Sequence, residues 1–397
     1  MLETDILIVG AGIVGLSLAR ELTRKFSNLK ITILEKESEV AFHASGRNSG
    51  VLHAGFYYDA NTLKAKFTVK GNKALTEYCL ENSIPINQCG KVVVAVDEKE
   101  LDGIYELKRR GDTNGVSLEI IDEKELNEIE PNAKTFQKAL FSPTTSTVNP
   151  KLVCNHIASN FSNNVRILFN RIFLKVKNKQ VTTNKEKIKF KYLYNAAGLY
   201  ADKIAHSFGI GQQYTVLPFK GIYLAYNDDD LIKRHIYPVP NLKNPFLGVH
   251  FTKTVNNHVK IGPTAIPAFW RENYTIKERF NLSEFLEIIA CQSKLFITNS
   301  FNFRSLALSE IKKYDRNFFI NEAKKLVKQL DVDNFGDYLQ PGIRAQLLNK
   351  QTNQLVMDFV VEHAENSTHV LNSVSPAFTT AFAFAEFVIK ESEHNFN

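Results

Sequence analysis

The chain has 397 residues, 44% of them apolar, which is enough for two domains, or for one large domain with an insertion. Its net charge of +7 comes from lysines and arginines scattered among nearly as many acids, so the charge does not indicate a nucleic-acid surface and fits a mild attraction for anionic substrates. Four cysteines without a CxxC pair give neither a disulfide framework nor a metal site, and we predict a reducing compartment and no metal.

The start of the chain has no basic segment or cleavage site of the secretory type, and no apolar stretch reaches the length of a membrane span. We therefore expect a cytoplasmic protein, and a peripheral contact with the inner face of a membrane stays open.

The first unit, residues 5–36, has the pattern strand, glycine-rich turn, helix, strand. The apolar run Ile6–Val9 is typical of a parallel strand buried on both faces, and a GxGxxG motif with helical apolar spacing follows it. In such a unit the glycines permit a tight turn, leave room for a pyrophosphate and let the helix pack, while the acid after the second strand binds ribose. The residues predicted to bind a dinucleotide here are Gly10, Gly12, Gly15, Glu35 and Lys36.

Residues 45–58, SGRNSGVLHAGFYY, have neither the alternation of a strand nor the spacing of an amphipathic helix. Glycines and short polar side chains permit close approach to a planar ligand. An irregular surface loop with a chance histidine is the alternative interpretation.

The next elements are a helix over 63–82, a strand over 91–96 and a charged, solvent-facing helix over 97–116. Further on, residues 282–330 have helical apolar spacing. They are interpreted as surface helices, and a helical excursion near the cavity mouth or close to a membrane is the alternative.

Between these lies FKYLYNAAGLYADKIAHSFGI, residues 190–210, a strand that enters a tight turn before a helix. It resembles the second dinucleotide-contacting turn of two-dinucleotide-binding-domain flavoproteins, which favours FAD over NAD. In the related D-amino-acid-oxidase-like group, the segment after the second strand crosses the flavin ring, so residues 45–58 are named the crossing segment here. These resemblances add Ser45, Arg47, Asn48, Ser49, Gly50, Ala196, Ala197, Gly198 and Asp202 to the expected cofactor residues.

Longer motifs resemble the L-2-hydroxyglutarate dehydrogenase/oxidase family. They are HASGRNSGVLHAGFYY, LKAKF, QCGKVVVAV, YPVP…PFLGVHFT (residues 237–252), IGPTAIPAFWRENY and PGIRAQLL. The resemblance implies oxidation of L-2-hydroxyglutarate to 2-oxoglutarate, with electrons passed from FAD to a quinone or to oxygen. Two positions depart from the family: Ile222 stands where an acid is usual, and the surroundings of Ser375–Ala377 are less rich in alanine.

A dicarboxylate alcohol requires cations, a base and a hydride acceptor, and FAD is the acceptor. His53 and His250 are both candidates for the base, and the choice between them is open. Arg344 has a guanidinium fork that matches a carboxylate. Lys220, Tyr223 and Tyr237 are weaker candidates for the wall of the substrate cavity. Gly342 and Pro376 complete the set of expected cofactor residues. For the distal carboxylate of the substrate, Arg47 or Arg271 would be a guess.

The expected fold is α/β, an FAD-binding Rossmann-like (two-dinucleotide-binding-domain) fold with a discontinuous mixed-sheet substrate domain. Residues 1–80, 144–212 and 335–397 would form the FAD-binding domain, and residues 81–143 and 213–334 the substrate domain. Two alternative functions stay open. One is the same fold acting on another small hydroxy acid, an amine or glycerol 3-phosphate; the other is a non-catalytic basic flavoprotein that binds RNA or a protein partner.

Overall fold

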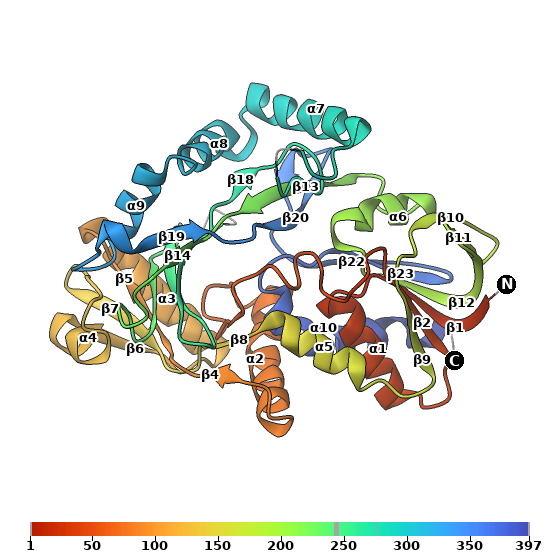
Figure 1. The fold of residues 1–397 in the computed structure, drawn as a ribbon, viewed down its shortest axis with the longest axis horizontal. Helices are drawn as coiled ribbons and strands as arrows, with labels where there is room; N and C mark the ends of the chain where they lie inside the picture. The colour runs from red at the N-terminus through yellow and green to blue at the C-terminus, as the bar shows by residue number, and fades with distance from the viewer. Residues whose placement is uncertain (1, 242–245, 276, 396–397) are drawn as a thin grey trace.

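The structure is a computed structural model that describes residues 2–241, 246–275 and 277–395. A largely parallel sheet forms one end of the molecule, and both chain termini lie at that end (Figure 1). Its central strand β1 pairs in parallel with β2 and β12, and its apolar run is buried as the sequence predicts. The strands are β1 (Leu2–Val9), β2 (Ile31–Leu34), β9 (Val165–Leu168), β10 (Phe173–Lys177), β11 (Gln180–Thr183), β12 (Lys187–Asn195), β22 (Val360–Ala364) and β23 (Ser367–Asn372).

Four helices cover one face of this sheet and share one apolar core with its strands. They are α1 (Ile13–Lys25), α2 (Leu63–Glu81), α5 (Pro150–Ser159) and α10 (Ala377–Ser392). The short helix α6 (Ala201–Ser207) packs on the opposite face through Ile204, together with side chains of β10 and β11. This arrangement of helices on both faces of a parallel sheet is the predicted Rossmann-like architecture.

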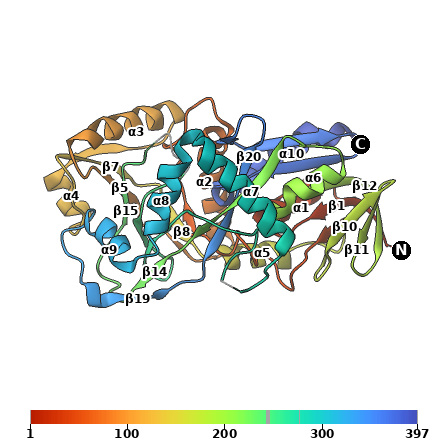
Figure 2. The same ribbon diagram turned by 90° about the horizontal axis from the view of Figure 1, so that it is seen from above.

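A second, mixed sheet lies at the other end of the molecule (Figures 1 and 2). One of its faces packs on α9 (Arg316–Lys324) and α4 (Glu123–Ile129), and the other packs on α3 (Leu101–Asn114) and the crossing segment. In spatial order its strands are β19 (Phe335–Tyr338), β14 (Leu224–Tyr226), β17 (Val259–Gly262), β16 (His250–Lys253), β15 (His235–Pro238), β5 (Lys91–Val94), β7 (Lys138–Ser142) and β6 (Glu119–Asp122).

Two small sheets connect the ends. One contains β13 (Tyr214–Gly221), β18 (Ile266–Pro267), β20 (Gly342–Asn349) and β21 (Gln354–Leu355), with α7 (Leu282–Thr298) and α8 (Phe303–Lys312) packed on one face. Figure 1 shows α7, α8 and α9 along one long side of the molecule. The other small sheet contains β3 (Val51–Leu52), β4 (Ile86–Asn87) and β8 (Ser146–Val148).

The predicted elements agree with α2, β5, α3 and the α7–α9 helices. The domain boundaries stay a prediction, and strand pairing crosses them at three places. Strand β4, within residues 81–143, pairs with β8, within residues 144–212. Strand β19, which begins at residue 335, pairs with β14 of the second sheet. Strands β13 and β20 pair along their whole length, although the predicted boundaries assign them to different domains.

Candidate functional site

The turn between β1 and α1 leaves its glycines no room for side chains. Gly10 has a φ of +106°, and a Cβ on it would lie 2.6 Å from the carbonyl oxygen of Ala196. A Cβ on Gly15 would lie 2.0 Å from the carbonyl oxygen of Gly10, so the third glycine allows α1 to pack against the turn. A Cβ on Gly12 would lie 2.9 Å from the Ser45 hydroxyl. The turn therefore has the close packing predicted for a nucleotide-binding motif.

Glu35 follows β2 with its carboxylate held in place. Oε2 accepts a hydrogen bond from the amide of Ala11 at 2.8 Å, and Oε1 accepts one from the amide of Glu37 at 2.9 Å. The side chain is buried and lies on the wall of a large cavity. A fixed carboxylate at this point suits the hydroxyl groups of a ribose.

That cavity has a volume of about 860 Å³, in the range of cofactor sites. Its wall combines the glycine turn, the crossing segment, the β12–α6 turn and the residues that precede α10. The predicted cofactor residues on the wall are Gly10, Gly12, Glu35, Lys36, Ser45, Arg47, Asn48, Ser49, Ala196, Ala197, Gly198, Gly342 and Pro376. Gly15, Gly50 and Asp202 lie outside it. The glycine cradle and the ribose-facing acid fit FAD.

One polar side chain of the crossing segment holds it against α1, and another stabilises a turn within the segment. Ser45 Oγ accepts the amide of Ile13 at 2.9 Å and thereby caps α1, whose N-cap residue Gly12 has no side chain. Asn48 Oδ1 accepts the amide of Gly50 at 2.8 Å. Gly50 has a φ of +77°, and a Cβ there would meet backbone, which explains why glycine occupies this position away from the cavity.

Arg47 and Gly342 mark the close approach of β20 to the crossing segment. A Cβ on Gly342 would lie 2.2 Å from the carbonyl oxygen of Arg47. The Arg47 side chain donates to the carbonyl of Phe42 at 2.9 Å and lies 4.2 Å from the centre of the Tyr274 ring. Arg47 is therefore already held by the protein, which weakens the guess that it binds the distal carboxylate.

The second sheet presents a polar face to the crossing segment. Along β5, Val92 and Val94 belong to the apolar core beneath the sheet, and Val93 lies on the opposite face. The buried polar side chains that alternate onto this face are Lys91, His235, Tyr237, His250 and Thr252, joined by Lys260.

His53 lies on the cavity wall and is 8% exposed. Its amide donates to the Thr379 hydroxyl at 3.1 Å, and Nδ1 is buried with no hydrogen-bond partner among the described residues. Burial lowers its pKa well below 6.5, and the positive charge of Lys91 lowers it further. The imidazole is therefore neutral at physiological pH, the form that accepts a proton.

His250 lies behind the wall of the cavity. Its ring stacks on Tyr237 with the ring centres 3.7 Å apart. Nδ1 lies 2.8 Å from the carbonyl oxygen of Gly248 and so donates to it, which leaves Nε2 as the acceptor. Burial lowers the pKa of His250 to about 3. The two histidines are neighbours, and only His53 reaches the cavity.

Arg344 and Tyr223 line the cavity with His53, as the sequence predicts for a substrate wall. The Tyr223 hydroxyl is hydrogen-bonded to Ser49, and burial raises its pKa to about 12. The two other predicted wall residues, Lys220 and Tyr237, are buried and lie outside the lining. Within the 237–252 motif, residues 242–245 lie outside the described residues.

Three lysines near this site were missed at the sequence level: Lys64 and Lys91, which are buried, and Lys260, which is partly buried. Lys64 lies 5.8 Å from the centre of the Tyr58 ring, and Lys260 lies 5.1 Å from that of Tyr223. Burial lowers the pKa of each of these two lysines to about 8. Lys91 is the first residue of the buried strand β5, and its side chain lies on the same face as that of Val93. A lysine at the start of an apolar run is unusual, and this was the sequence feature that could have identified it.

Asp202 and Arg271 form a buried ion pair away from the cavity. The guanidinium makes a bidentate contact with the carboxylate, with distances of 2.7 and 2.8 Å, and both side chains are fully buried. Asp202 also accepts the amide of Val216 at 2.9 Å. This pair joins α6 to the loop after β18. Asp202 therefore does not lie at the cofactor cavity as predicted, and Arg271 is not free to bind the substrate.

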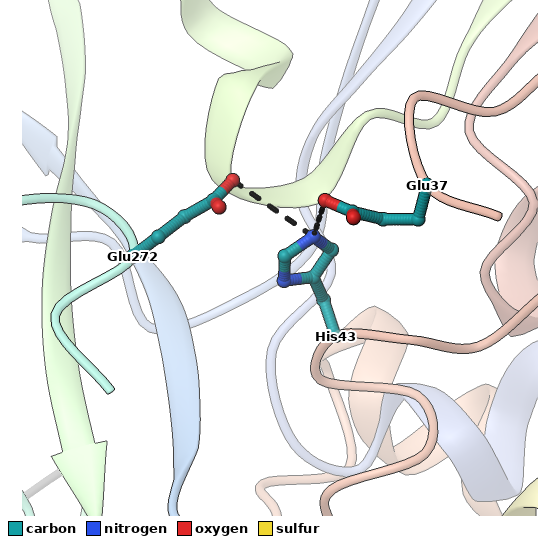
Figure 3. A group of neighbouring side chains, drawn as sticks. All are labelled: Glu37, His43 and Glu272. Atoms are coloured by element: carbon teal, nitrogen blue, oxygen red, sulfur yellow. Dashed lines mark hydrogen bonds and ion pairs between the residues drawn. The ribbon is translucent and has the colours of Figure 1, made fainter. Parts of the chain in front are cut away.

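Glu37, His43 and Glu272 form a cluster at the edge of the cavity, with the imidazole between the two carboxylates (Figure 3). His43 Nε2 lies 2.9 Å from Glu37 and 3.8 Å from Glu272. Lys36 and Arg279 each contact both carboxylates. Because two cations already neutralise the two acids, we interpret the cluster as an ion-pair network that links the loop after β18 to the segment after β2.

Comparison with known proteins gives concordant results. The model of the FAD dependent oxidoreductase family matches residues 5–390. A mitochondrial L-2-hydroxyglutarate dehydrogenase of Nematostella vectensis is 35% identical over 99% of this chain and 91% of its own length. An L-2-hydroxyglutarate dehydrogenase of Escherichia coli is 32% identical over 98% of this chain and 92% of its own length.

Among solved structures, the dithionite-reduced L-α-glycerophosphate oxidase of Mycoplasma pneumoniae with FAD bound has a TM-score of 0.77. It is 23% identical and covers 100% of this chain and 95% of that chain. This likeness confirms the predicted fold class. In the part of the chain that the structure describes, no helix combines the length and apolarity needed to cross a bilayer.

Proposed function

Because the chain belongs to the FAD dependent oxidoreductase family and aligns almost end to end with relatives named L-2-hydroxyglutarate dehydrogenase, we propose that it oxidises L-2-hydroxyglutarate to 2-oxoglutarate. The observation that carries this proposal is the placement of His53 and Arg344 on the wall of the cofactor cavity. A base and a carboxylate-binding cation are the two groups that a 2-hydroxy acid requires beside a hydride acceptor. Bound FAD supplies that acceptor.

Arg344 binds the carboxylate next to the alcohol carbon. Its planar fork can hold both carboxylate oxygens and so fix the orientation of the adjacent carbon. Tyr223, whose hydroxyl stays protonated because burial raises its pKa to about 12, is available as a donor on the same wall.

His53 is the preferred base. It takes the proton of the C2 hydroxyl while the C2 hydrogen leaves with its electron pair, and the C2–O bond becomes the carbonyl of 2-oxoglutarate. His250 is less suited because it lies behind the cavity wall and its Nδ1 is engaged with Gly248. Its supporting role is to stack on Tyr237 and to hold that side of the sheet.

The electrons then pass to a quinone or to oxygen. Helices α7 and α8 are a candidate region for peripheral membrane contact, because large apolar side chains are exposed along them. These side chains are Leu282, Leu286, Phe296, Ile297, Leu308 and Ile311. Turnover with a soluble quinone compared with turnover under oxygen alone distinguishes the two acceptors.

A substrate panel tests the proposed reaction. Purified protein with an artificial electron acceptor is supplied with L-2-hydroxyglutarate, L-2-hydroxybutyrate, glycine and glycerol 3-phosphate, and kcat/KM is measured for each. We expect L-2-hydroxyglutarate to give the highest value. A higher value with glycerol 3-phosphate or glycine would favour the alternative substrate classes, and reduction by none of the four would favour a non-catalytic flavoprotein.

A further inference from the structure

Of the two carboxylates of L-2-hydroxyglutarate, the one remote from the alcohol still lacks a partner. The two arginines considered from the sequence are already engaged, Arg47 with Phe42 and Tyr274, and Arg271 with Asp202. The missing partner should be a cation near His53 that the protein itself leaves uncompensated.

Lys91 has this property. Its side chain is 0% exposed, and its ammonium lies 4.7 Å from the ring centre of Phe56, 4.5 Å from that of Tyr57 and 4.7 Å from that of Tyr237. Nζ has no hydrogen-bond partner among the residues that the structure describes. A buried ammonium is costly unless it is paired, and ring faces replace only part of its lost hydration. Lys91 and Tyr57, like His250 and Tyr237, lie outside the cavity lining, so an anion reaches the three donors of Nζ only when the surrounding rings move apart.

Two neighbouring polar atoms also lack a hydrogen-bond partner. The hydroxyl of Tyr57 and Nδ1 of His53 are both buried without a hydrogen-bond partner in the described chain. Tyr57 forms one side of the aromatic box around Lys91, and the charge of Lys91 lowers the pKa of His53. An ammonium and a phenol beside the base are suitable donors for one carboxylate.

The other two lysines near the site are better compensated. Lys64 lies near Asp358, whose charge raises its pKa against the effect of burial. Lys260 lies 3.5 Å from the carbonyl oxygen of Asn48. Lys91 is therefore the strongest candidate among the three.

We propose that Lys91, assisted by the hydroxyl of Tyr57, binds the distal carboxylate of the substrate and makes the enzyme selective for diacids. This inference rests on the proposed function, since it concerns the substrate named there. The aromatic box of Phe56, Tyr57 and Tyr237 holds the ammonium in the absence of substrate, and the entering carboxylate replaces ring contacts with an ion pair. The lysine determines specificity and takes no part in proton or hydride transfer.

The test compares two unreactive acids that differ by one carboxylate. Glutarate and butyrate are titrated into the FAD-loaded protein, and dissociation constants are obtained from the change in the flavin absorbance. Lys91→Met should weaken glutarate binding by roughly 10- to 100-fold, the value of a charged hydrogen bond, and leave butyrate binding nearly unchanged. Lys91→Arg should restore part of the preference for glutarate.

Lys253→Met is the matched control, because Lys253 is a buried lysine of the same sheet that donates to the carbonyl of Asp229. It should keep the wild-type ratio of the two dissociation constants. If Lys91→Met does not retain FAD, Lys91→Gln serves as the second variant.

Equal weakening of both acids, or an unchanged glutarate constant, would overturn the proposal for Lys91. The proposed function fails separately if the wild-type protein binds glutarate through Lys91 and yet is not reduced by L-2-hydroxyglutarate. The selective loss should also appear in catalysis, where Lys91→Met lowers kcat/KM for L-2-hydroxyglutarate far more than for L-2-hydroxybutyrate.

Discussion

At the scale of single residues, the site depends on keeping an imidazole neutral inside the protein. His53 is buried close to the positive charge of Lys91, and these surroundings lower its pKa. The same surroundings become less unfavourable to a protonated imidazole when an anionic substrate enters. The substrate can thus promote the proton transfer that its own oxidation requires.

Replacing His53 should therefore remove the base and leave the cofactor bound. We expect His53→Asn to slow flavin reduction by L-2-hydroxyglutarate by about 10²- to 10⁴-fold, the usual contribution of a general base. Stopped-flow absorbance measures the rate, and the flavin-to-protein ratio measures retention. His250→Asn is the comparison, and a larger loss in that variant would reverse the assignment of the base.

The cost of burying Lys91 predicts a pH-dependent effect on stability. Burial lowers its pKa from 10.5 to about 7, so between these values the folded chain binds fewer protons than the unfolded chain and its stability rises with pH. Lys91→Met should therefore stabilise the substrate-free protein, by roughly 1–3 kcal/mol at pH 6, with a smaller gain at pH 9. Urea unfolding at both pH values measures this, and a gain that grows with pH would contradict it.

Only some residues of this site could be identified from the sequence. His53 and Arg344 lie in long motifs and were predictable, whereas Lys91 has meaning only when three aromatic rings from distant segments surround it. Asp202 was expected at the cofactor because it follows the second turn. Its partner Arg271 is 69 residues away along the chain, and local patterns contain no information on such a pair.

At the scale of elements, α1 depends on a cap supplied by another segment. Its N-cap residue is Gly12, and Ser45 Oγ accepts the amide of Ile13 instead. The cap and the crossing segment therefore stabilise each other at the point where a pyrophosphate would bind.

Enlarging Gly12 tests this arrangement. Gly12→Val would force its Cβ to within 2.9 Å of the Ser45 hydroxyl and would narrow the turn. We expect the purified variant to lose FAD while its far-UV circular dichroism stays close to that of the wild type. Ser45→Ala should be milder and weaken FAD binding by several-fold, through a lost cap of about 1 kcal/mol. Full retention of FAD by Gly12→Val would contradict the placement of the cofactor.

Local elements were more predictable than their pairing. The β1–α1–β2 unit and α2 follow from short periodic patterns. The sheet that joins β13 to β20 does not, because its strands lie far apart in the sequence and their register depends on tertiary packing. For the same reason the domain boundaries could be drawn only approximately.

At the scale of the whole molecule, ion pairs link the loop after β18 to α6 and to the segment after β2. The loop after β18 contributes Arg271, which pairs with Asp202 in the interior, and Glu272, which joins the network of Lys36 and Glu37 at the cavity edge. This loop lies beside the ribose-facing end of the cavity, where Glu35 lies.

Breaking the buried pair should destabilise the protein strongly. Asp202→Ala leaves the buried guanidinium of Arg271 with Glu287, at 3.8 Å, in place of its bidentate partner, which costs about 3–5 kcal/mol in the free energy of unfolding. Lys108→Ala, which removes one half of an exposed pair with Asp112, should cost less than about 1 kcal/mol. Equal losses in the two variants, measured by urea unfolding, would refute the structural role given to the Asp202–Arg271 pair. The double variant Asp202→Leu/Arg271→Met should recover much of the loss.

Anaerobic mixing of the purified protein with L- and with D-2-hydroxyglutarate, followed by the flavin absorbance, tests the proposed reaction most directly. We expect the L isomer to bleach the flavin and the D isomer to leave it oxidised. A protein that is isolated without flavin and cannot be reconstituted with FAD, or a flavin that neither isomer reduces, would contradict it.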